Sequence, residues 1–321
     1  MKLVNFELEG KHCLGAVKGD LIVNVPATFD LVMNRAVKFE SETARSKARH
    51  LLVQSRLPAG DMTEILPREE VWLLALDEIL DGVIDYFHGN PEFGRLFVST
   101  RGAQLKAPIL RPGKIICVGR NYAEHARERG SEASAQPIFF LKSNNAICGP
   151  GDAIVIPPNS TQVDYEAELA VVIGKGGKNI TEEEAYEHVA GYTILNDVTA
   201  RDMQAADTQW FRGKSCDTFA PIGPWIVTRD EISDPHDLRL SLDLNGETMQ
   251  DSNTGNMIFK IPYLISYLSQ SMTLEPGDIL STGTPAGIGA SRTPPVFLKP
   301  GDTVSVTVER IGTLTNSVAA A

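Results

Sequence analysis

The chain has 321 residues, 42% of them apolar and 22% charged, which is typical of a globular protein with one large domain or two smaller ones. Its 30 basic and 41 acidic residues give a net charge of −11, which argues against nucleic acid and anionic membranes as partners. No apolar run approaches the roughly 18 residues of a transmembrane helix. The four cysteines are scattered without a CxxC pair, so we expect reduced thiols in a cytoplasmic protein.

The N-terminal part predicts a small α+β unit. Short alternating runs at Leu3 to Glu7, His12 to Lys18 and Leu21 to Val25 predict strands, and we expect the first of these, with its early acid, to be a strand rather than a signal peptide. Helical spacing predicts helices at Ser41 to Gln54 and Glu69 to Phe87. This part holds no cluster of chemically capable residues, so we interpret it as an accessory domain.

A proline-containing segment, Leu105 to Pro112, predicts the linker between two domains, residues 1–108 and 109–321. Beyond it, Pro-Gly-Asp occurs three times, and each copy predicts a turn into a strand, because proline sets φ at the second turn position and glycine tolerates positive φ at the third. The three copies begin at Pro150, Pro276 and Pro300, and the last leads into a predicted strand at Thr303 to Glu309.

Local signals complete the prediction for the larger domain. Asn245-Gly246 between two alternating runs predicts a two-residue hairpin, and Thr181 to Glu184 has the capping-box pattern of a helix start. Lys260 to Gln270 predicts a helix whose Pro262 is tolerated in the first turn. Many strands and few helices indicate an α+β, β-rich fold, a barrel or sandwich of mixed strands rather than a doubly wound sheet.

Two acidic side chains open an apolar strand in the segment Asp164-Tyr165-Glu166-Ala167-Glu168. Residues i and i+2 of a strand share a face, so Glu166 and Glu168 are predicted to point the same way. Two such carboxylates repel each other unless a cation or a proton lies between them. The alternative is an exposed strand edge with two solvated acids.

A second partly apolar strand ends in an acid, Asp197. Three carboxylates from strands suit a hard divalent cation, and the absence of histidine in these segments argues against zinc. The alternative for Asp197 is an N-cap of a helix beginning near Thr199.

A third group, Gly119 to Glu128, carries His125 and Glu128 three residues apart. On a helix they face the same side, and a carboxylate beside an imidazole can orient it for activating water. The alternative is an exposed charged helix. Arg201, Gln204, Lys214 and the turn at Thr284 could each bind a carboxylate or an oxyanion, or could be surface residues.

Together and in this order, these segments resemble the fumarylacetoacetate hydrolase family over roughly Pro112 to Val318. The residues that carry the resemblance include Gly119-Arg120-Asn121-Tyr122, Phe140-Leu141-Lys142, Tyr165-Glu166-Ala167-Glu168-Leu169, Asp197 to Asp202, Lys214-Ser215, Met257-Ile258-Phe259 and Thr282 to Gly287. The N-terminal part also resembles the small domain of longer members.

The resemblance implies a mixed β-roll or β-sandwich barrel, a homodimer and a bound Mg²⁺ or Mn²⁺, with Ca²⁺ as a further option. The metal ligands it implies are Glu166, Glu168 and Asp197. It also implies a lid that carries His125 and Glu128. For substrate contacts it implies Gln204, Lys214, Arg201, Thr284, Arg120 and Tyr122.

From this we expect a hydrolase acting on a carbon–carbon bond of a ketonic substrate, a β-diketo acid such as an acylpyruvate or fumarylpyruvate. His125, oriented by Glu128, would deprotonate a water, while Lys214 and Gln204 would stabilise the oxyanion. The alternatives are an oxaloacetate decarboxylase, an isomerase or hydratase of meta-cleavage 2-oxo acids and, from another class, a non-catalytic metal-stabilised binding protein.

Overall fold

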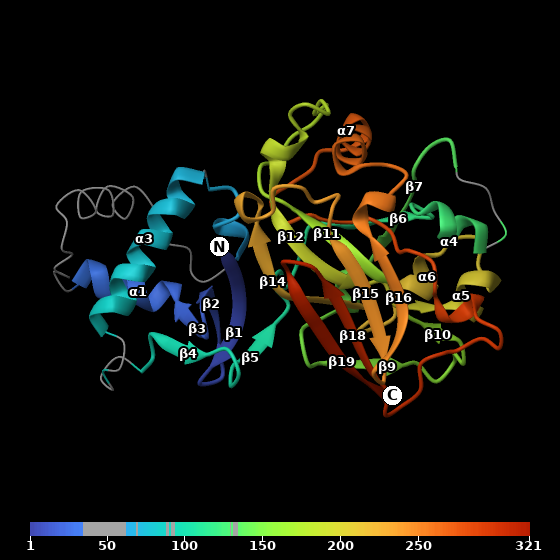
Figure 1. Ribbon diagram of the computed structural model, residues 1–321, viewed down its shortest axis with the longest axis horizontal. Helices are drawn as coiled ribbons and strands as arrows, with labels where there is room; N and C mark the ends of the chain where they lie inside the picture. Colours follow the sequence, from blue (N-terminus) through green and yellow to red (C-terminus); the bar gives the residue numbers. More distant parts are fainter. Residues whose placement is uncertain (35–61, 69, 88–89, 91–93, 129, 131–133) are drawn as a thin grey trace.

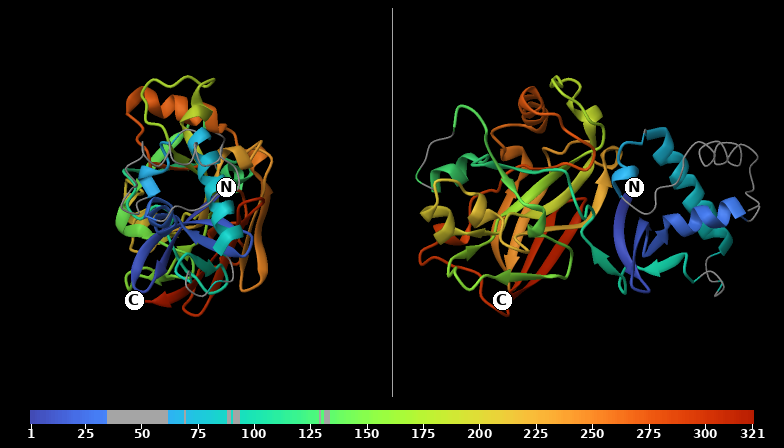
Figure 2. Two further views of the ribbon diagram at one scale, coloured as in Figure 1. Left: turned by 90° about the vertical axis from the view of Figure 1, so that its left-hand side faces the viewer. Right: turned by 180° about the vertical axis from the view of Figure 1, so that it is seen from behind.

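The computed structural model describes residues 1–34, 62–68, 70–87, 90, 94–128, 130 and 134–321. An N-terminal region lies at one end of the long axis and a larger strand-rich region at the other, as the front, end-on and rear views agree (Figures 1 and 2). The α+β, β-rich fold expected from the sequence is confirmed. None of the helices in these described ranges is long and apolar enough to cross a membrane.

The N-terminal region is an antiparallel meander covered by two helices. The predicted strands are confirmed as β1 (Lys2–Leu8), β2 (Lys11–Lys18) and β3 (Leu21–Asn24), and the predicted second helix as α3 (Glu70–Phe87). Val25 does not extend β3 but begins α1 (Val25–Asn34), which the sequence analysis missed. The helix predicted at Ser41 to Gln54 lies outside the described residues.

One large sheet runs through both regions, because β1 pairs with β14 (Ala220–Thr228) through Lys2–Val227 and Leu3–Ile226. The predicted linker is partly a strand: β5 (Gln104–Lys106) pairs with β1, and β4 (Phe97–Ser99) pairs with β3. The division at residue 108 therefore stays a prediction, since strand pairing and a shared core cross it. The sheet continues from β14 through β12 (Val189–Asn196), β11 (Ala167–Ile173), β17 (Ile279–Ser281), β6 (Ile115–Gly119) and β7 (Ile138–Lys142), with β8 (Ile147–Cys148) parallel to β14.

A second, five-stranded sheet packs on one face of the large sheet. Its order is β16 (Glu247–Asn253), β15 (Arg239–Leu244), β18 (Thr303–Val308), β19 (Gly312–Ala320) and β9 (Ala153–Ile156). Leu169 and Val171 of β11 face the core between the two sheets, while Ala170 and Val172 face the core shared with the N-terminal region. Burial on both faces explains why this strand is continuously apolar rather than alternating.

The predicted turns are confirmed. In each Pro-Gly-Asp copy the glycine has positive φ (79° at Gly151, 86° at Gly277 and 95° at Gly301). The aspartate of each copy accepts a hydrogen bond from the backbone N–H three residues earlier, at 2.7–2.8 Å. Asn245 and Gly246, with φ of 55° and 84°, form the predicted hairpin turn between β15 and β16.

The two helix predictions of the larger region had different outcomes. Helix α7 (Ile261–Ser271) is confirmed, with its proline in the first turn. The capping-box hydrogen bonds between Thr181 and Glu184 also form, but they lead only into a 3₁₀ turn at Ala185–His188, so the helix predicted there is wrong. The segment is too short to propagate a helix before β12 begins at Val189.

Candidate metal centre and active site

The antiparallel register of β11 and β12 brings three carboxylates together. Ala167 pairs with Asn196, so Glu166, just before β11, lies beside Asp197, just after β12. The Asp197 N–H donates to the Glu166 carbonyl at 2.8 Å. Oxygen atoms of Glu166, Glu168 and Asp197 all lie within 4.8 Å of one another, which fits a divalent cation.

All three acids are buried, with exposed fractions of 5%, 1% and 0% for Glu166, Glu168 and Asp197. The alternative of a solvated strand edge is therefore excluded. The helix-cap alternative for Asp197 is excluded as well, because helix α5 (Arg201–Ala206) begins four residues later, after Ala200. The short strands β10 (Val163–Asp164) and β13 (Thr199–Ala200), which flank Glu166 and Asp197 in sequence, pair with each other.

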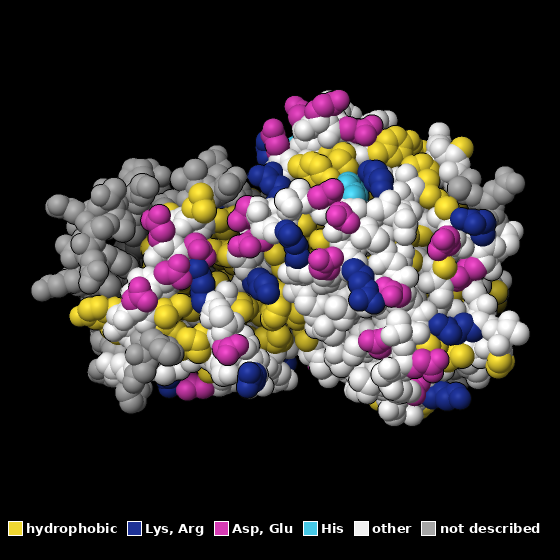
Figure 3. Space-filling view, viewed as in Figure 1, with side chains coloured by type: hydrophobic (Ala, Val, Ile, Leu, Met, Phe, Trp, Pro, Cys, Tyr) yellow, Lys and Arg dark blue, Asp and Glu magenta, His cyan; other side chains and the backbone are white. Residues whose placement is uncertain are grey.

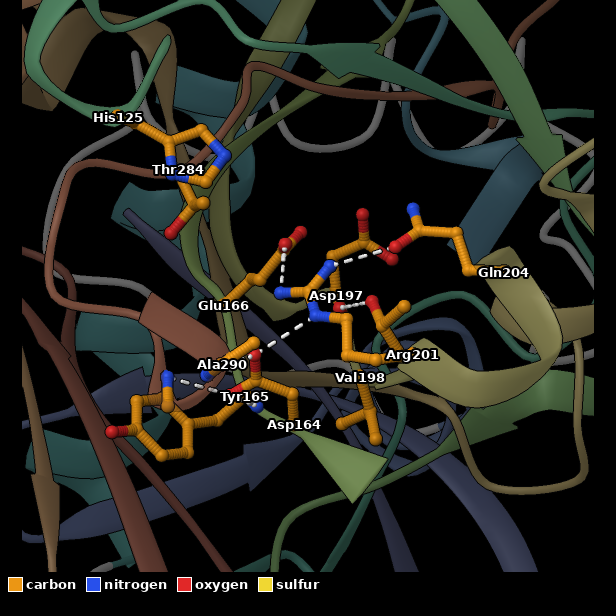
Figure 4. Close-up of polar contacts among 12 residues, drawn as sticks. His125, Asp164, Tyr165, Glu166, Asp197, Val198, Arg201, Gln204, Thr284 and Ala290 are labelled. Atoms are coloured by element: carbon orange, nitrogen blue, oxygen red, sulfur yellow. Dashed lines mark hydrogen bonds and ion pairs between the residues drawn. The ribbon is translucent and has the colours of Figure 1, made fainter. Parts of the chain in front are cut away.

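Three buried cations surround the acids. Lys142 Nζ donates to Asp197 Oδ1 at 2.5 Å, and Lys214 Nζ donates to Glu166 Oε2 at 2.8 Å and to Asp197 Oδ2 at 2.6 Å. Arg201 lies between two carboxylates (Figure 4): Nη2 donates to Glu166 Oε1 at 2.6 Å and Nε donates to Asp164 Oδ2 at 2.8 Å. Lys214 comes from the short helix α6 (Phe211–Lys214).

Charge balance supports a cation at this centre. Four buried carboxylates, from Asp164, Glu166, Glu168 and Asp197, lie with three buried cations, so ionisation of all four would leave one excess negative charge. Unbalanced buried charge is costly. One divalent cation would turn this excess into one positive charge, which suits an anionic substrate.

The pKa values of the two glutamates diverge. Burial opposes ionisation of Glu166, but the charges of Lys214 and Arg201 hold its pKa well below the usual range. Burial and then the charges of Asp197 and Glu166 raise the pKa of Glu168 well above its usual range, although its Oε2 accepts from Ser281 Oγ at 2.5 Å and from the Gly283 N–H at 2.8 Å. Within the described part of the chain no cation forms an ion pair with Glu168, and a bound metal ion would supply one.

The predicted His125–Glu128 pair lies on helix α4 (Ala123–Glu128). His125 is only 7% exposed, which excludes a solvated helix face, and its Nδ1 lies 3.5 Å from Glu128 Oε1. Glu128 Oε2 accepts from the Gly287 N–H at 2.9 Å. Burial would raise the pKa of Glu128, but its contact with His125 and the hydrogen bond from the Gly287 N–H lower it.

A cavity of about 190 Å³ lies over the carboxylates, and most of the predicted site residues line it. They are Arg120, His125, Glu166, Glu168, Arg201, Gln204, Lys214 and Thr284. Figure 4 shows Thr284 and His125 on one side of Glu166 and Gln204 on the other.

Three predicted residues, Glu128, Asp197 and Tyr122, do not line this cavity. Glu128 lies behind His125 on the same helix, and Asp197 lies beside Glu166. Tyr122 is 2% exposed, and burial and the nearby charge of Glu168 raise its pKa. The Tyr122 hydroxyl has no hydrogen-bond partner within the described part of the chain. Its predicted contact with substrate stays a prediction.

The sequence analysis missed several residues of the site. Lys142 was part of a landmark motif, and a lysine that closes the apolar run Ile138–Lys142 was a usable signal for a buried ion pair. Asp164 is 0% exposed and accepts from Arg201, from the Gly289 N–H at 2.8 Å and from the Ala290 N–H at 3.0 Å. No local pattern marks Asp164, since its partners are 37 and about 125 residues away.

Comparisons with known proteins test the family resemblance. The family profile "Fumarylacetoacetate (FAA) hydrolase C-terminal" matches residues 114–319, which confirms the resemblance drawn from the sequence. A relative from Xenopus laevis named oxaloacetate tautomerase, mitochondrial, is 50% identical over 286 residues, 88% of this chain and 90% of its own. A Bos taurus protein of the same activity name is 52% identical over 214 residues, 66% of this chain and 68% of its own.

Among solved structures, a fumarylacetoacetate hydrolase from Exiguobacterium antarcticum is similar over the full length of both chains. It is 34% identical in sequence, with a TM-score of 0.75. The likeness includes the N-terminal region, so the whole architecture described above recurs in a relative.

Proposed function

This chain belongs to the fumarylacetoacetate hydrolase family, and we propose that it is a divalent-metal-dependent enzyme that interconverts the enol and keto forms of oxaloacetate or a closely related 2-oxo dicarboxylic acid. The observation that carries the proposal is the buried cluster of Glu166, Glu168 and Asp197 beneath a cavity lined with hydrogen-bond donors. The two relatives that are about half identical in sequence carry the name of this activity.

The three carboxylates would hold Mg²⁺ or Mn²⁺, since both ions prefer oxygen ligands, and Ca²⁺ is a further option. When bound, the ion would supply positive charge for the carboxylate and carbonyl oxygens of a 2-oxo acid. Arg201 and Lys214 fix the orientation of Glu166 by holding both of its oxygens. The ligand set is thereby pre-organised, which lowers the cost of ordering it on binding.

Protein donors would bind the rest of the substrate. Arg201 Nη1 donates to Gln204 Oε1 at 3.2 Å, so the Gln204 amide N–H groups are directed away from Arg201 and are available to a substrate oxygen. Lys214, kept protonated by Asp197 and Glu166, lines the same cavity. These groups would stabilise negative charge that develops on the substrate oxygen.

His125 would move the proton. In ketonisation the enol oxygen loses a proton and the carbon at the other end of the C=C bond gains one, so no atom is gained or lost overall. An imidazole at the cavity wall can take one proton and return another, and Glu128 would hold the ring and stabilise its protonated form.

Hydrolysis of an acylpyruvate or fumarylpyruvate is the second candidate. The His125–Glu128 pair favours it, because the same base could activate a water, and the similar Exiguobacterium structure is named a hydrolase. Decarboxylation and isomerisation of meta-cleavage acids would use the same carboxylates and need no attacking water. A non-catalytic binding protein would need no proton carrier at all.

A substrate panel separates these candidates. Metal-stripped protein is given oxaloacetate, acetylpyruvate, fumarylpyruvate or a heptenedioate, with and without added Mg²⁺, and both the loss of enol absorbance and the release of pyruvate are followed. We expect metal-dependent loss of the oxaloacetate enol without release of pyruvate. Faster release of pyruvate from acetylpyruvate would instead support the hydrolase, and binding without any turnover would support the binding protein.

We also propose a homodimer, which light scattering in solution tests. The cytoplasmic location stays a proposal, since the names of the two similar relatives specify mitochondria.

A further inference from the structure

A β-bulge turns one polar side chain of the second sheet toward the active site. The pairing of β15 with β16 shifts between Leu242 and Asp243, so that Gln250 lies opposite Leu242 and Thr248 opposite Asp243, with Met249 as the extra residue. Without the extra residue Gln250 would face outward, because a shift of one residue exchanges the two faces of a strand. Gln250 is 1% exposed as a result.

The orientation of the Gln250 amide is determined by its backbone partners. Its Oε1 accepts from the Ala167 N–H at 2.9 Å, and its Nε2 donates to the Pro285 carbonyl at 2.9 Å. A backbone N–H can only donate and a carbonyl can only accept, so the oxygen and nitrogen of the amide cannot be exchanged. Ala167 also lies between the two glutamates of the metal centre.

The second hydrogen of Nε2 points to Thr284 Oγ1 at 2.9 Å. The Thr284 oxygen is therefore the acceptor in this contact, and the hydroxyl hydrogen of Thr284 takes no part in it. Within the described part of the chain no acceptor takes that hydrogen, while Thr284 lines the cavity over the carboxylates. The hydroxyl hydrogen is thus available to donate to an oxygen of a bound ligand.

We propose that Gln250 is a positioning residue that fixes the Thr284 hydroxyl as a hydrogen-bond donor, so that this side of the cavity selects a carboxylate or carbonyl oxygen. The proposal deepens the proposed function and rests on it for the class of substrate. Under this proposal the substrate is recognised at two places: at the metal centre formed by the three carboxylates and at the Thr284 hydroxyl.

The test combines single variants with their double variant. Thr284→Val removes the hydroxyl at nearly constant volume, Thr284→Ser keeps it, and Gln250→Met removes the amide at similar length. Two quantities are measured with Mg²⁺ present: the KM and kcat for the oxaloacetate enol, and the Kd of malate, an unreactive four-carbon dicarboxylate, by calorimetry. Binding of Mg²⁺ is measured separately.

For Thr284→Val we expect the KM and the malate Kd to rise about tenfold, as for a lost hydrogen bond to a charged group, while Thr284→Ser stays near wild type. Gln250→Met should raise both constants several-fold, with kcat and the Mg²⁺ Kd within about twofold of wild type. The double variant should be no worse than Thr284→Val, because both changes remove the same hydrogen bond.

The opposite results would overturn the proposal. If Gln250 only supports the fold, Gln250→Met will weaken Mg²⁺ binding or leave the malate Kd unchanged, and its effect will multiply with that of Thr284→Val. Should Gln250→Met fail to fold, Gln250→Glu replaces it: the new oxygen would accept the Thr284 hydrogen and its charge would repel an anion, so its malate Kd should rise at least as much as that of Thr284→Val. An unchanged malate Kd would overturn the proposal.

The malate measurement keeps the two proposals separable. Wild type that binds malate but leaves the enol unchanged contradicts the proposed function alone, and the variants still test Gln250. Wild type that binds neither malate nor oxaloacetate contradicts both.

Discussion

The N-terminal region and the larger region are built alike but bury different chemistry. Both present strands of one continuous sheet and share an apolar core. Among the described residues of the N-terminal region, the buried polar side chains are uncharged: Asn5, Asn24 and Thr28. The larger region buries acids and cations together around Glu166. Exposed charges of both signs, by contrast, are scattered over both regions on the face shown in Figure 3.

This difference indicates that the free-energy cost of burying charge falls in the larger region. Burying an ion costs several kcal/mol unless partners compensate for it, and an apolar core would serve stability at least as well. The N-terminal ion pairs, such as Lys106 with Glu7, stay partly exposed, with side-chain exposures of 18% and 33%. A buried, incompletely compensated cluster is therefore better explained by binding and catalysis than by stability. Four predictions test this contrast.

The largest effect is expected for Glu166→Gln. The change removes one carboxylate ligand and leaves Arg201 and Lys214 facing a neutral amide, so we expect metal binding and turnover to be lost together. Mn²⁺ calorimetry and the enol assay measure the two effects. The matched control is Glu7→Gln in the N-terminal sheet, which should leave both unchanged, and full activity of Glu166→Gln would contradict the assignment.

The next effect concerns stability. Lys142→Met leaves the buried Asp197 with one cation fewer, and we expect it to destabilise the metal-free protein by about 3–5 kcal/mol. Lys106→Met breaks a partly exposed pair and should cost less than about 1 kcal/mol. Urea unfolding in a chelating buffer gives both values. Equal costs for the two variants would remove the contrast between the regions.

A smaller effect is expected for His125→Ala, and it is confined to turnover. His125 lines the cavity without holding any of the three carboxylates by a hydrogen bond, so metal affinity should stay within about twofold while kcat falls about 10²-fold, the usual contribution of a general acid or base. Parallel metal titrations and enol assays make the comparison. An unchanged kcat would refute the role of His125 as proton carrier.

The smallest effect is a change in acid stability through Glu128. Its pKa is lowered in the folded protein, so its contribution is present above the unfolded value of about 4.3 and is lost as the pH falls through the folded value. Glu128→Gln removes the titrating group, and the urea midpoint should then fall less steeply between about pH 5 and pH 3. An unchanged slope would mean that Glu128 is not held by His125 and Gly287.

Local patterns predicted much of the fold. Strand alternation, three Pro-Gly-Asp turns and Asn245-Gly246 each depend on residues that are neighbours in sequence, and each was confirmed. Pairing of β1 with β14, about 225 residues apart, has no local signal, so the continuity of the sheet across the predicted linker could not be foreseen. The helix expected after Thr181 failed because a cap satisfies donors but cannot supply the length that a helix needs.

The same distinction holds for the site. Strand periodicity placed Glu166 and Glu168 on one face, and the ordered motifs added Asp197, His125 and Lys214. The contacts made by Asp164 and Gln250 depend on tertiary packing: one accepts from a loop about 125 residues away, and the other enters through a bulge in a different sheet. Residues of this kind can be identified only once the fold is known.

The central claim, that the three carboxylates form a metal site, is tested most directly by calorimetry. The number of Mn²⁺ ions bound per chain is measured for metal-stripped wild type and for Glu168→Gln. Glu168 has no positive partner in the described structure that would keep it charged, so its variant should lose the ion while remaining folded. We predict one ion per chain in wild type and none in the variant at the same concentrations. Binding of equal strength in the two proteins would show that the three carboxylates do not form the metal site.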